Sequence, residues 1–388
     1  MIPYGKQFID NEDINSVINV LKSNYLTQGP LTPKFESLIL KKTKSKYAVA
    51  TNSGTSALHI SCLALGLKKN DLLWTSPNSF IASANCAEYC GASVDFVDID
   101  FKTGNVDSEY FEEKLKNAKK KNKLPKIFIP VHFGGQPTDQ SKIWKLAKKY
   151  NVKIIEDASH SLGAKNHNEQ VGSCKFSDIT VTSFHPVKTI TTAEGGVALT
   201  NSIKLFNRLK EYRVHGVVQA NYKYNGSFCS YFQKNLGYNY RLSDIHSAIG
   251  ISQISKINKF IIERRKIYTK YINAFKISNI EPIKHKKNYF SSNHLFVIRP
   301  KYSIKKFSNI KAINFLRQKG LGVNSHYYPI HLQPYYRKKG FKIGSFPNAE
   351  KHGKISVSIP IFVGLTAENQ DKIIKILNNY YNEFEYKK

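Results

Sequence analysis

A repeated strand–turn–helix pattern between residues 47 and 157 is the feature that most restricts the fold of this chain. Five short apolar segments each end at a polar or glycine-containing turn, and amphipathic stretches lie between them. The segments are Tyr47–Thr51, Leu72–Thr75, Val94–Val97, Ile127–Val131 and Val152–Ile155. Strands that alternate with helices at this interval are typical of an α/β fold, in which a mainly parallel sheet carries helices on both faces.

The C-terminal part of the chain shows a different pattern. A long amphipathic helix is predicted first, followed by a strand and two further helices. The expected ranges are 242–271 for the long helix, 293–299 for the strand, and 304–319 and 367–384 for the helices. We therefore predict a large domain over residues 1–250 and a smaller C-terminal α/β domain over residues 251–388.

The charge of the chain is strongly positive, with 59 Lys and Arg against 28 Asp and Glu, a net charge of +31. No basic motif with interleaved aromatic residues accompanies this charge, so nucleic-acid binding is not predicted. The same positive field would attract a small anionic substrate. The five cysteines lack paired metal-binding or redox spacing, and no apolar run is long enough to span a membrane. A cytoplasmic protein without a metal site is therefore expected.

Lys188 is the first candidate for chemistry. It lies between the β-branched segment Ile179–Thr182 and the glycine pair Gly195–Gly196, which places it at the end of a strand. A free lysine has a pKa near ~10.4, and burial lowers this value until the amine can form a Schiff base. The alternative is that Lys188 is one of many surface lysines in a lysine-rich chain.

Two further features can share a pocket with Lys188. The loop Asn52–Ala57 joins a predicted strand to a helix, so its backbone N–H groups and hydroxyls can bind an anion; the alternative is an ordinary helix cap. Asp157 ends a predicted strand at the carboxyl edge of the sheet, where α/β folds bind ligands; it too can instead be a helix cap. Only 31 residues separate Asp157 from Lys188, which leaves room for one hairpin and one strand.

Taken together, these parts resemble the site of a fold-type I pyridoxal-phosphate enzyme, and more closely the DegT-type sugar aminotransferases. The matching stretches follow the order of the family along nearly the whole chain. They are Leu26–Pro30, Asn52–Ala57, Ser79–Asn85, Glu156–Ala164, Ser183–Gly196 and Gly237–Leu242. The resemblance implies a seven-stranded, mainly parallel sheet between helices, a smaller C-terminal domain, and pyridoxal 5′-phosphate as the cofactor.

The resemblance also implies roles for individual residues. Lys188 would carry the cofactor as a Schiff base, and Asp157 would pair with the ring nitrogen. Phe80 would stack on the ring, although a core phenylalanine on a helix is the alternative. The phosphate would be held by three hydroxyls, those of Thr55, Ser56 and Ser183.

Other implied contacts involve a second subunit or the substrate. Asn239 would reach the phosphate bound by the neighbouring subunit, which makes a homodimer the expected active unit. His160 stands where relatives often have glutamine and would lie near the phenolic oxygen of the cofactor. Further candidates for substrate binding are Thr27, Arg241, His326 and His331, the two histidines having a surface or packing role as the alternative. His185 has no assigned role and is expected to be structural.

Within the family, Ser183–Gly196, Ser291–Leu295 and His326–His331 are most similar to the aminotransferases of pseudaminic acid biosynthesis. This implies transfer of the amino group of L-glutamate to C4 of a UDP-linked 2-acetamido-2,6-dideoxy-4-ketohexose. Alternatives are a dTDP- or GDP-linked 3- or 4-ketosugar as the substrate, a ketosugar dehydratase with the same cofactor, and a non-catalytic regulator that binds nucleic acid. Relatives that dehydrate carry histidine in place of the Schiff-base lysine, which disfavours the second alternative.

Overall fold

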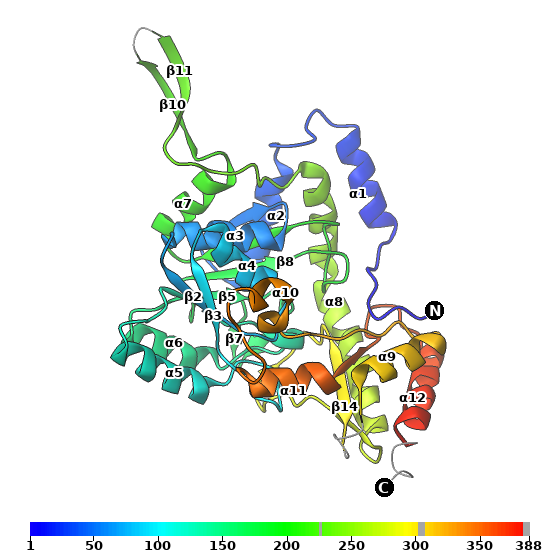
Figure 1. Cartoon of the computed structure of the whole chain (residues 1–388). Helices are drawn as coiled ribbons and strands as arrows, with labels where there is room; N and C mark the ends of the chain where they lie inside the picture. Colours follow the sequence, from blue (N-terminus) through cyan, green and yellow to red (C-terminus); the bar gives the residue numbers. More distant parts are fainter. Residues whose placement is uncertain (225–226, 302–306, 383–388) are drawn as a thin grey trace.

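A seven-stranded sheet forms the centre of the molecule in the computed structural model, which describes residues 1–224, 227–301 and 307–382 (Figure 1). The strand order is β1 (Tyr47–Thr51), β9 (Gly196–Thr200), β8 (Ile179–Ser183), β5 (Lys153–Asp157), β4 (Ile127–Ile129), β2 (Leu72–Thr75) and β3 (Ser93–Phe96). Within this sheet β9 alone runs antiparallel to its neighbours. The predicted α/β fold with a mainly parallel sheet is confirmed.

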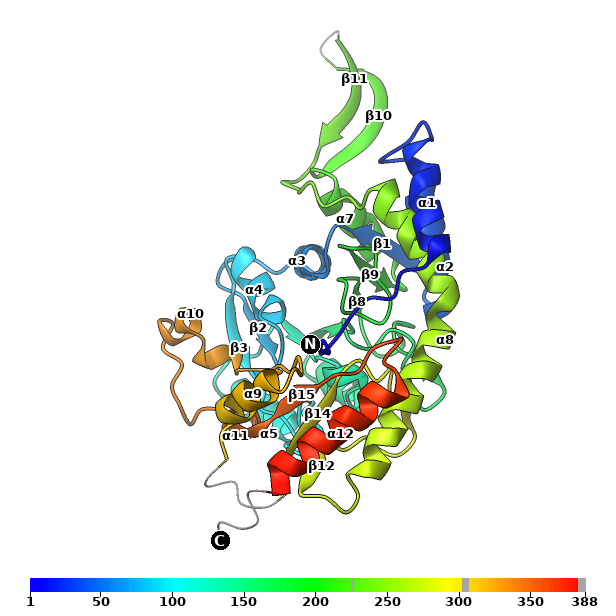
Figure 2. The same ribbon diagram turned by 90° about the vertical axis from the view of Figure 1, so that its right-hand side faces the viewer.

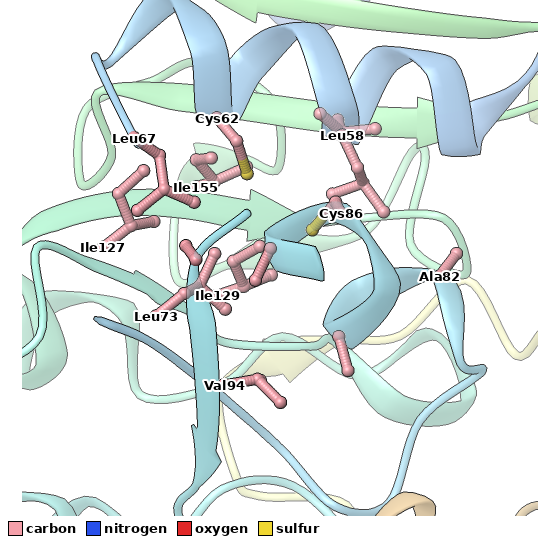
Figure 3. Packing of buried hydrophobic residues seen from close by; sticks show 14 of the residues in the cluster. Leu58, Cys62, Leu67, Leu73, Ala82, Cys86, Val94, Ile127, Ile129 and Ile155 are labelled. Atoms are coloured by element: carbon pink, nitrogen blue, oxygen red, sulfur yellow. The ribbon is translucent and has the colours of Figure 1, made fainter. Parts of the chain in front are cut away.

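Helices cover both faces of this sheet because its strands are apolar on both sides. Ile127 and Ile129 of β4 point to one face, where they pack beneath α3 (Gly54–Ala64), α4 (Ala82–Tyr89) and α7 (Ile203–Arg213). Phe128, between them, points to the other face and packs against α5 (Ser108–Lys120) and α6 (Gln140–Lys149). Figure 3 shows the first of these cores, in which Leu58 and Cys62 of α3 lie against the strands.

The long helix α8 (Asp244–Ala274) belongs to two hydrophobic cores. Ile257 and Ile261 pack with the central sheet and with α2 (Leu31–Thr43). Ile267 and Tyr271 pack in a second core, built on the three-stranded sheet β12–β14–β15 and on α9 and α12. Those elements are β12 (Ile280–Pro282), β14 (Phe296–Pro300), β15 (Val357–Ile359), α9 (Asn309–Gln318) and α12 (Ala367–Asn382). The predicted domain boundary at residue 250 thus falls inside α8, ahead of the point where its packing changes.

Two segments cross between these cores. The backbone of Ile2 forms a parallel bridge with Leu321, and Tyr4 O accepts a hydrogen bond from Ile361 N at 3.2 Å, which ties the N-terminus to the second core. In the opposite direction, Tyr336 and Phe346 pack against the first core. Each half of the chain therefore contributes residues to the core of the other half.

The remaining elements lie around this frame. The hairpin β10 (Val217–Tyr224) and β11 (Ser227–Gln233) projects from the body of the molecule (Figures 1 and 2). The others are α1 (Asn11–Leu21), η1 (Phe133–Gly135), β6 (Lys165–Asn166), β7 (Glu169–Gln170), β13 (Tyr289–Phe290), η3 (Ile330–Leu332), α10 (Pro334–Arg337) and α11 (Pro347–Ile355). The predicted start of a helix at Ile304 and the predicted end at Phe384 both lie outside the described residues. Among the described helices, none has the length and apolar character that a membrane crossing requires.

Candidate active site

A cavity of about 690 Å³ opens where β5 and β8 end and α3 begins. This is the carboxyl edge of the parallel strands, the place where open α/β sheets bind ligands. Its wall combines the central sheet with segments from the C-terminal half, including Asn324 and His326. Lys188, Asp157, Thr55, Phe80, His160 and Ser183 all line it.

Lys188 follows β8 in a turn in which its backbone N–H donates to His185 O at 2.9 Å. Burial lowers the pKa of Lys188 to about 8, and the negative charge of Asp157 acts in the opposite direction. A lysine with this pKa is partly neutral near physiological pH, so its nitrogen can act as a nucleophile or as a base.

Asp157 is the last residue of β5, and its carboxylate accepts hydrogen bonds from two neighbours. Its Oδ2 accepts from Ser83 Oγ at 2.7 Å, and Ser83 Oγ lies 2.8 Å from Ser79 Oγ. Its Oδ1 accepts from the backbone N–H of Ser159 at 3.1 Å. These donors orient the carboxylate toward the cavity, where it can pair with a cationic ring nitrogen. Sequence reasoning missed Ser83, which lies in the first turn of α4.

The segment Asn52–Ala57 at the start of α3, the anion loop, has the groups that an anion site needs. Ser53 caps the helix, because its Oγ accepts from Ser56 N at 3.1 Å. A Cβ added to Gly54 would lie 2.9 Å from Ser183 Cβ, so the loop and the end of β8 are in direct contact. The helix N-terminus and the hydroxyls of Ser53, Thr55 and Ser183 therefore face one place.

Ser56, predicted to hold the phosphate, does not line the cavity. Its hydroxyl donates to Asn52 Oδ1 at 2.6 Å and the residue is buried behind the cavity wall. Ser53 does line the cavity, and its own hydroxyl is bonded within the loop, to the backbone N–H and the Oγ of Ser56.

His160 also lines the cavity and is hydrogen-bonded at both ring nitrogens. Gly134 N–H donates to its Nδ1 at 3.3 Å, and its Nε2 lies 3.2 Å from Tyr327 Oη. Burial, followed by the charges of Lys188 and His326, lowers the pKa of His160 well below its usual value. His160 is therefore neutral. Tyr327, which sequence reasoning did not single out, is its partner in the cavity wall.

The aromatic side chains that line the cavity include those of Phe80, His185 and His326. Phe80 is 57% exposed and precedes α4, so it is not a helical core residue and offers a ring face for stacking. His326 lines the cavity, and its Nδ1 lies 2.8 Å from Ser358 Oγ. His185, expected to be structural, is exposed on the cavity wall instead.

Four predicted residues lie outside the cavity of their own chain. Thr27 and Asn239 are exposed, Arg241 is half-buried, and none of the three lines the cavity. The backbone of Arg241 nevertheless pairs with Thr51, just before the lining residue Ser53. For His331 the structure is a correction, because this residue is fully buried between the rings of Phe96 and Phe346. Its Nε2 lies 3.0 Å from Glu350 Oε1, so it packs in the core and does not line the cavity.

Comparison with known proteins identifies the family. The model of the DegT/DnrJ/EryC1/StrS aminotransferase family matches residues 7–378. The chain belongs to this family. A UDP-4-amino-4,6-dideoxy-N-acetyl-beta-L-altrosamine transaminase of Campylobacter jejuni is 37% identical over 93% of this chain and 92% of its own length. An uncharacterized protein of Methanocaldococcus jannaschii, MJ1066, is 35% identical over 97% of this chain and 96% of its own.

Solved structures of this aminotransferase family agree with the fold. Helicobacter pylori PseC, an aminotransferase involved in the biosynthesis of pseudoaminic acid, is 30% identical with a TM-score of 0.88, covering 99% of this chain and 100% of that chain. The PLP form of the putative sugar aminotransferase Spr1654 from Streptococcus pneumoniae is 25% identical, also with a TM-score of 0.88, over 98% of this chain and 99% of that one. The protein is thus a pyridoxal-phosphate-dependent aminotransferase.

The cavity of this aminotransferase fits the cofactor. Asp157 and Lys188 provide a carboxylate for the ring nitrogen and an amine for the aldehyde. The N-terminus of α3 is tightly packed against Ser183 and has no acidic side chain in its first turn, as a phosphate site requires. Phe80 supplies an exposed aromatic face at the same cavity.

Proposed function

We propose that this aminotransferase moves the amino group of L-glutamate to C4 of a UDP-linked 2-acetamido-2,6-dideoxy-4-ketohexose. The observation that carries the proposal is the 37% identity, over nearly the full length of both chains, to a UDP-4-amino-4,6-dideoxy-N-acetyl-beta-L-altrosamine transaminase, whose name specifies a UDP-linked 4-amino-4,6-dideoxy sugar. The proposal also assigns pyridoxal phosphate contacts to Lys188, Asp157, Thr55, Ser183 and Phe80.

The character of the cavity wall supports a sugar as the acceptor. Beyond the cofactor residues, the C-terminal half contributes hydrogen-bonding side chains, namely Asn324, Ser325, His326, Tyr327, Tyr328, Gln333 and His294. Burial lowers the pKa of His326 to about 3 and that of His294 well below its usual value, so these groups are neutral. Neutral donors and acceptors suit the hydroxyl and amide groups of a 2-acetamido sugar.

Each residue then has a defined task in the transfer. The bound cofactor supplies an electron sink for the carbon that loses its proton. Lys188 Nζ takes that proton from the amino-bearing carbon of the donor and returns a proton to the carbonyl carbon of the acceptor, a form of catalysis typically worth ~10²–10⁴-fold. Asp157 keeps the ring nitrogen protonated, and Phe80 holds the ring in place. Donor and acceptor use the same site in turn, which predicts ping-pong kinetics.

The proposal is tested by offering the purified enzyme L-glutamate with UDP-, dTDP- and GDP-linked 4-keto and 3-keto sugars. We expect amination at C4 of the UDP-linked 2-acetamido-4-ketosugar, identified by mass spectrometry and NMR. Lys188→Ala is the matched control for an enzyme-dependent product. Preferred amination of a dTDP- or GDP-linked sugar, or of C3, would contradict the substrate assignment and leave the aminotransferase class intact.

The same assay addresses the two remaining alternatives. A deoxygenated sugar product would identify a ketosugar dehydratase, which the presence of Lys188 in the cavity disfavours. Replacing L-glutamate by L-glutamine or L-aspartate identifies the donor. An enzyme loaded with pyridoxal phosphate absorbs in the near-visible, and only the preferred donor should bleach that absorption band. Aminotransferase family membership leaves no support for a non-catalytic nucleic-acid regulator.

The proposal also includes a homodimer, in which Asn239 of each subunit reaches the site of the other. Sedimentation analysis would test the dimeric state.

A further inference from the structure

His160, Gly134 and Tyr327 form a short chain of hydrogen bonds that fixes the position of protons. Gly134 N–H can only donate, so His160 Nδ1, 3.3 Å away, must be the acceptor. A neutral imidazole carries its one proton on the other nitrogen. His160 therefore has its proton on Nε2, which donates to Tyr327 Oη at 3.2 Å.

This assignment leaves the proton of Tyr327 without an acceptor. His160 Nε2 is the single hydrogen-bond partner of Tyr327 Oη in the described part of the chain, and it cannot accept. Burial and the carboxylate of Asp157 raise the pKa of Tyr327, so the phenol keeps its proton. Tyr327 lines the cavity, and the free O–H is consequently a donor available to a bound ligand.

The strand order shows which part of the cofactor faces this donor. The anion loop packs on Ser183 and Gly196, at the ends of β8 and β9. Asp157 ends β5, and Gly134 follows β4 on the far side of Asp157. The cofactor would place its phosphate at the anion loop, its ring nitrogen at Asp157 and its aldehyde at Lys188. Its phenolic oxygen, on the opposite side of the ring from the phosphate arm, would then face away from the loop. This is the β4 side of the cavity.

We propose that Tyr327 is a catalytic residue whose hydroxyl donates a hydrogen bond to the phenolic oxygen of the cofactor, and that His160 is a positioning residue acting through it. This replaces the direct contact expected of His160, whose two nitrogens are both engaged within the protein. Two further contacts fix His160: Ser292 Oγ donates to its backbone carbonyl at 2.6 Å, and the ring of His294 lies 4.4 Å from the His160 imidazole between centroids. The inference does not depend on which sugar is aminated.

Loss of this hydrogen bond has a predictable sign. A phenolic oxygen without its donor is more basic, so it holds the proton that it shares with the Schiff-base nitrogen more tightly. The near-visible band of the loaded enzyme should then titrate at higher pH. The titratable groups around the Gly134–His160–Tyr327 hydrogen bonds are Tyr4, Asp157, Lys188, His294 and His326, and the variants leave all of them in place.

The test compares Tyr327→Phe with His160→Gln and with the double variant. For Tyr327→Phe we expect the midpoint of the band to rise by about one pH unit, the loss typical of a hydrogen bond to a charged group. Binding of pyridoxamine phosphate, which does not bond covalently to Lys188, should weaken about tenfold by calorimetry. His160→Gln should move the midpoint by less than half as much, because Tyr327 still donates. In the double variant the glutamine amide can donate directly and should recover part of the shift.

Tyr335→Phe is the matched control, because this exposed tyrosine donates to Glu88 Oε2 at 3.2 Å outside the cavity. Its band and its affinity for pyridoxamine phosphate should equal those of the wild type. Circular dichroism confirms folding, which Tyr327→Phe should preserve because the ring and its edge contact with Phe133 remain. An unshifted band in Tyr327→Phe, or a shift in His160→Gln as large as that in Tyr327→Phe, would overturn the proposal and make His160 the direct donor.

Discussion

The contact between Gly54 and Ser183 makes a sharp prediction for the variant Gly54→Ala. The first residue of α3 has no room for a side chain, because an added Cβ would lie 2.9 Å from Ser183 Cβ and 3.2 Å from Ser183 Oγ. Both distances are below ordinary van der Waals contact. Rotation of the Ser183 side chain moves Oγ and leaves Cβ in place, so α3 and the end of β8 must move apart. This movement displaces groups that we assign to the cofactor phosphate.

The magnitude follows from two opposing effects. Overpacking of this kind typically costs about 1–3 kcal/mol. Alanine in place of a helical glycine returns roughly 0.4–1 kcal/mol through the unfolded state. The net cost to folding is therefore about 0–2.6 kcal/mol. The overpacking itself acts on cofactor affinity, and about 1–2 kcal/mol of it at the phosphate site corresponds to roughly 5- to 30-fold weaker binding.

The assay is a titration of the apo-enzyme with pyridoxamine phosphate, together with urea unfolding of the same protein. Gly5→Ala is the matched control, because its Cβ would meet Val187 at an ordinary 3.6 Å. A second variant, Gly54→Ala with Ser183→Gly, removes the opposing Cβ and should show a penalty smaller than the sum of the single changes. Wild-type affinity and stability in Gly54→Ala would refute the reasoning.

Three further predictions concern Lys188, His331 and Arg264. Loading of the apo-enzyme with pyridoxal phosphate should speed up as pH rises through about 8, because only the neutral Lys188 amine attacks the aldehyde; stopped-flow rates with a midpoint near 10 would show that burial does not lower this pKa. His331→Leu should lower the free energy of unfolding by about 1–3 kcal/mol by removing the partner of Glu350, and a raised KM for either substrate would contradict its place in the core. Arg264→Met should destabilise the protein by about 3 kcal/mol in calorimetry, because Arg264 Nη1 donates to the buried carbonyls of Asn293, His294 and Ile361; a loss below about 0.5 kcal/mol would contradict that role.

The strands of the central sheet were predictable because each is a short apolar run bounded by polar or glycine turns. Tyr47–Thr51 and Leu72–Thr75 have the predicted bounds, and the span between Asp157 and Lys188 holds the expected hairpin β6–β7 and strand β8. The order of the strands and the reversed direction of β9 had no local signal. They depend on which strands pair across the sheet, a choice made by contacts far apart in the sequence.

The placement of Lys188, Asp157 and the anion loop in one cavity follows from a general rule, since all three lie where strands end or helices begin. The supporting contacts could not be predicted in the same way. Ser83 reaches Asp157 across 74 residues, and Tyr327 reaches His160 across 167. His331 shows the opposite failure, because its residue type suggested chemistry whereas burial beside Glu350 made it a packing residue.

The pairing of Ile2 with Leu321 has a consequence for the synthesis of the chain. Residues 2–4 are translated long before their backbone partners, Gly320–Gly322 and Ile361. At ~5–20 residues per second on the ribosome, this segment therefore waits at least ~16 s for its partners to be translated. Tyr4 lines the catalytic cavity, so that wall is completed only after residue 361 has been translated. Nascent chains arrested before residue 320 should consequently fold the central sheet and still lack a finished cofactor pocket.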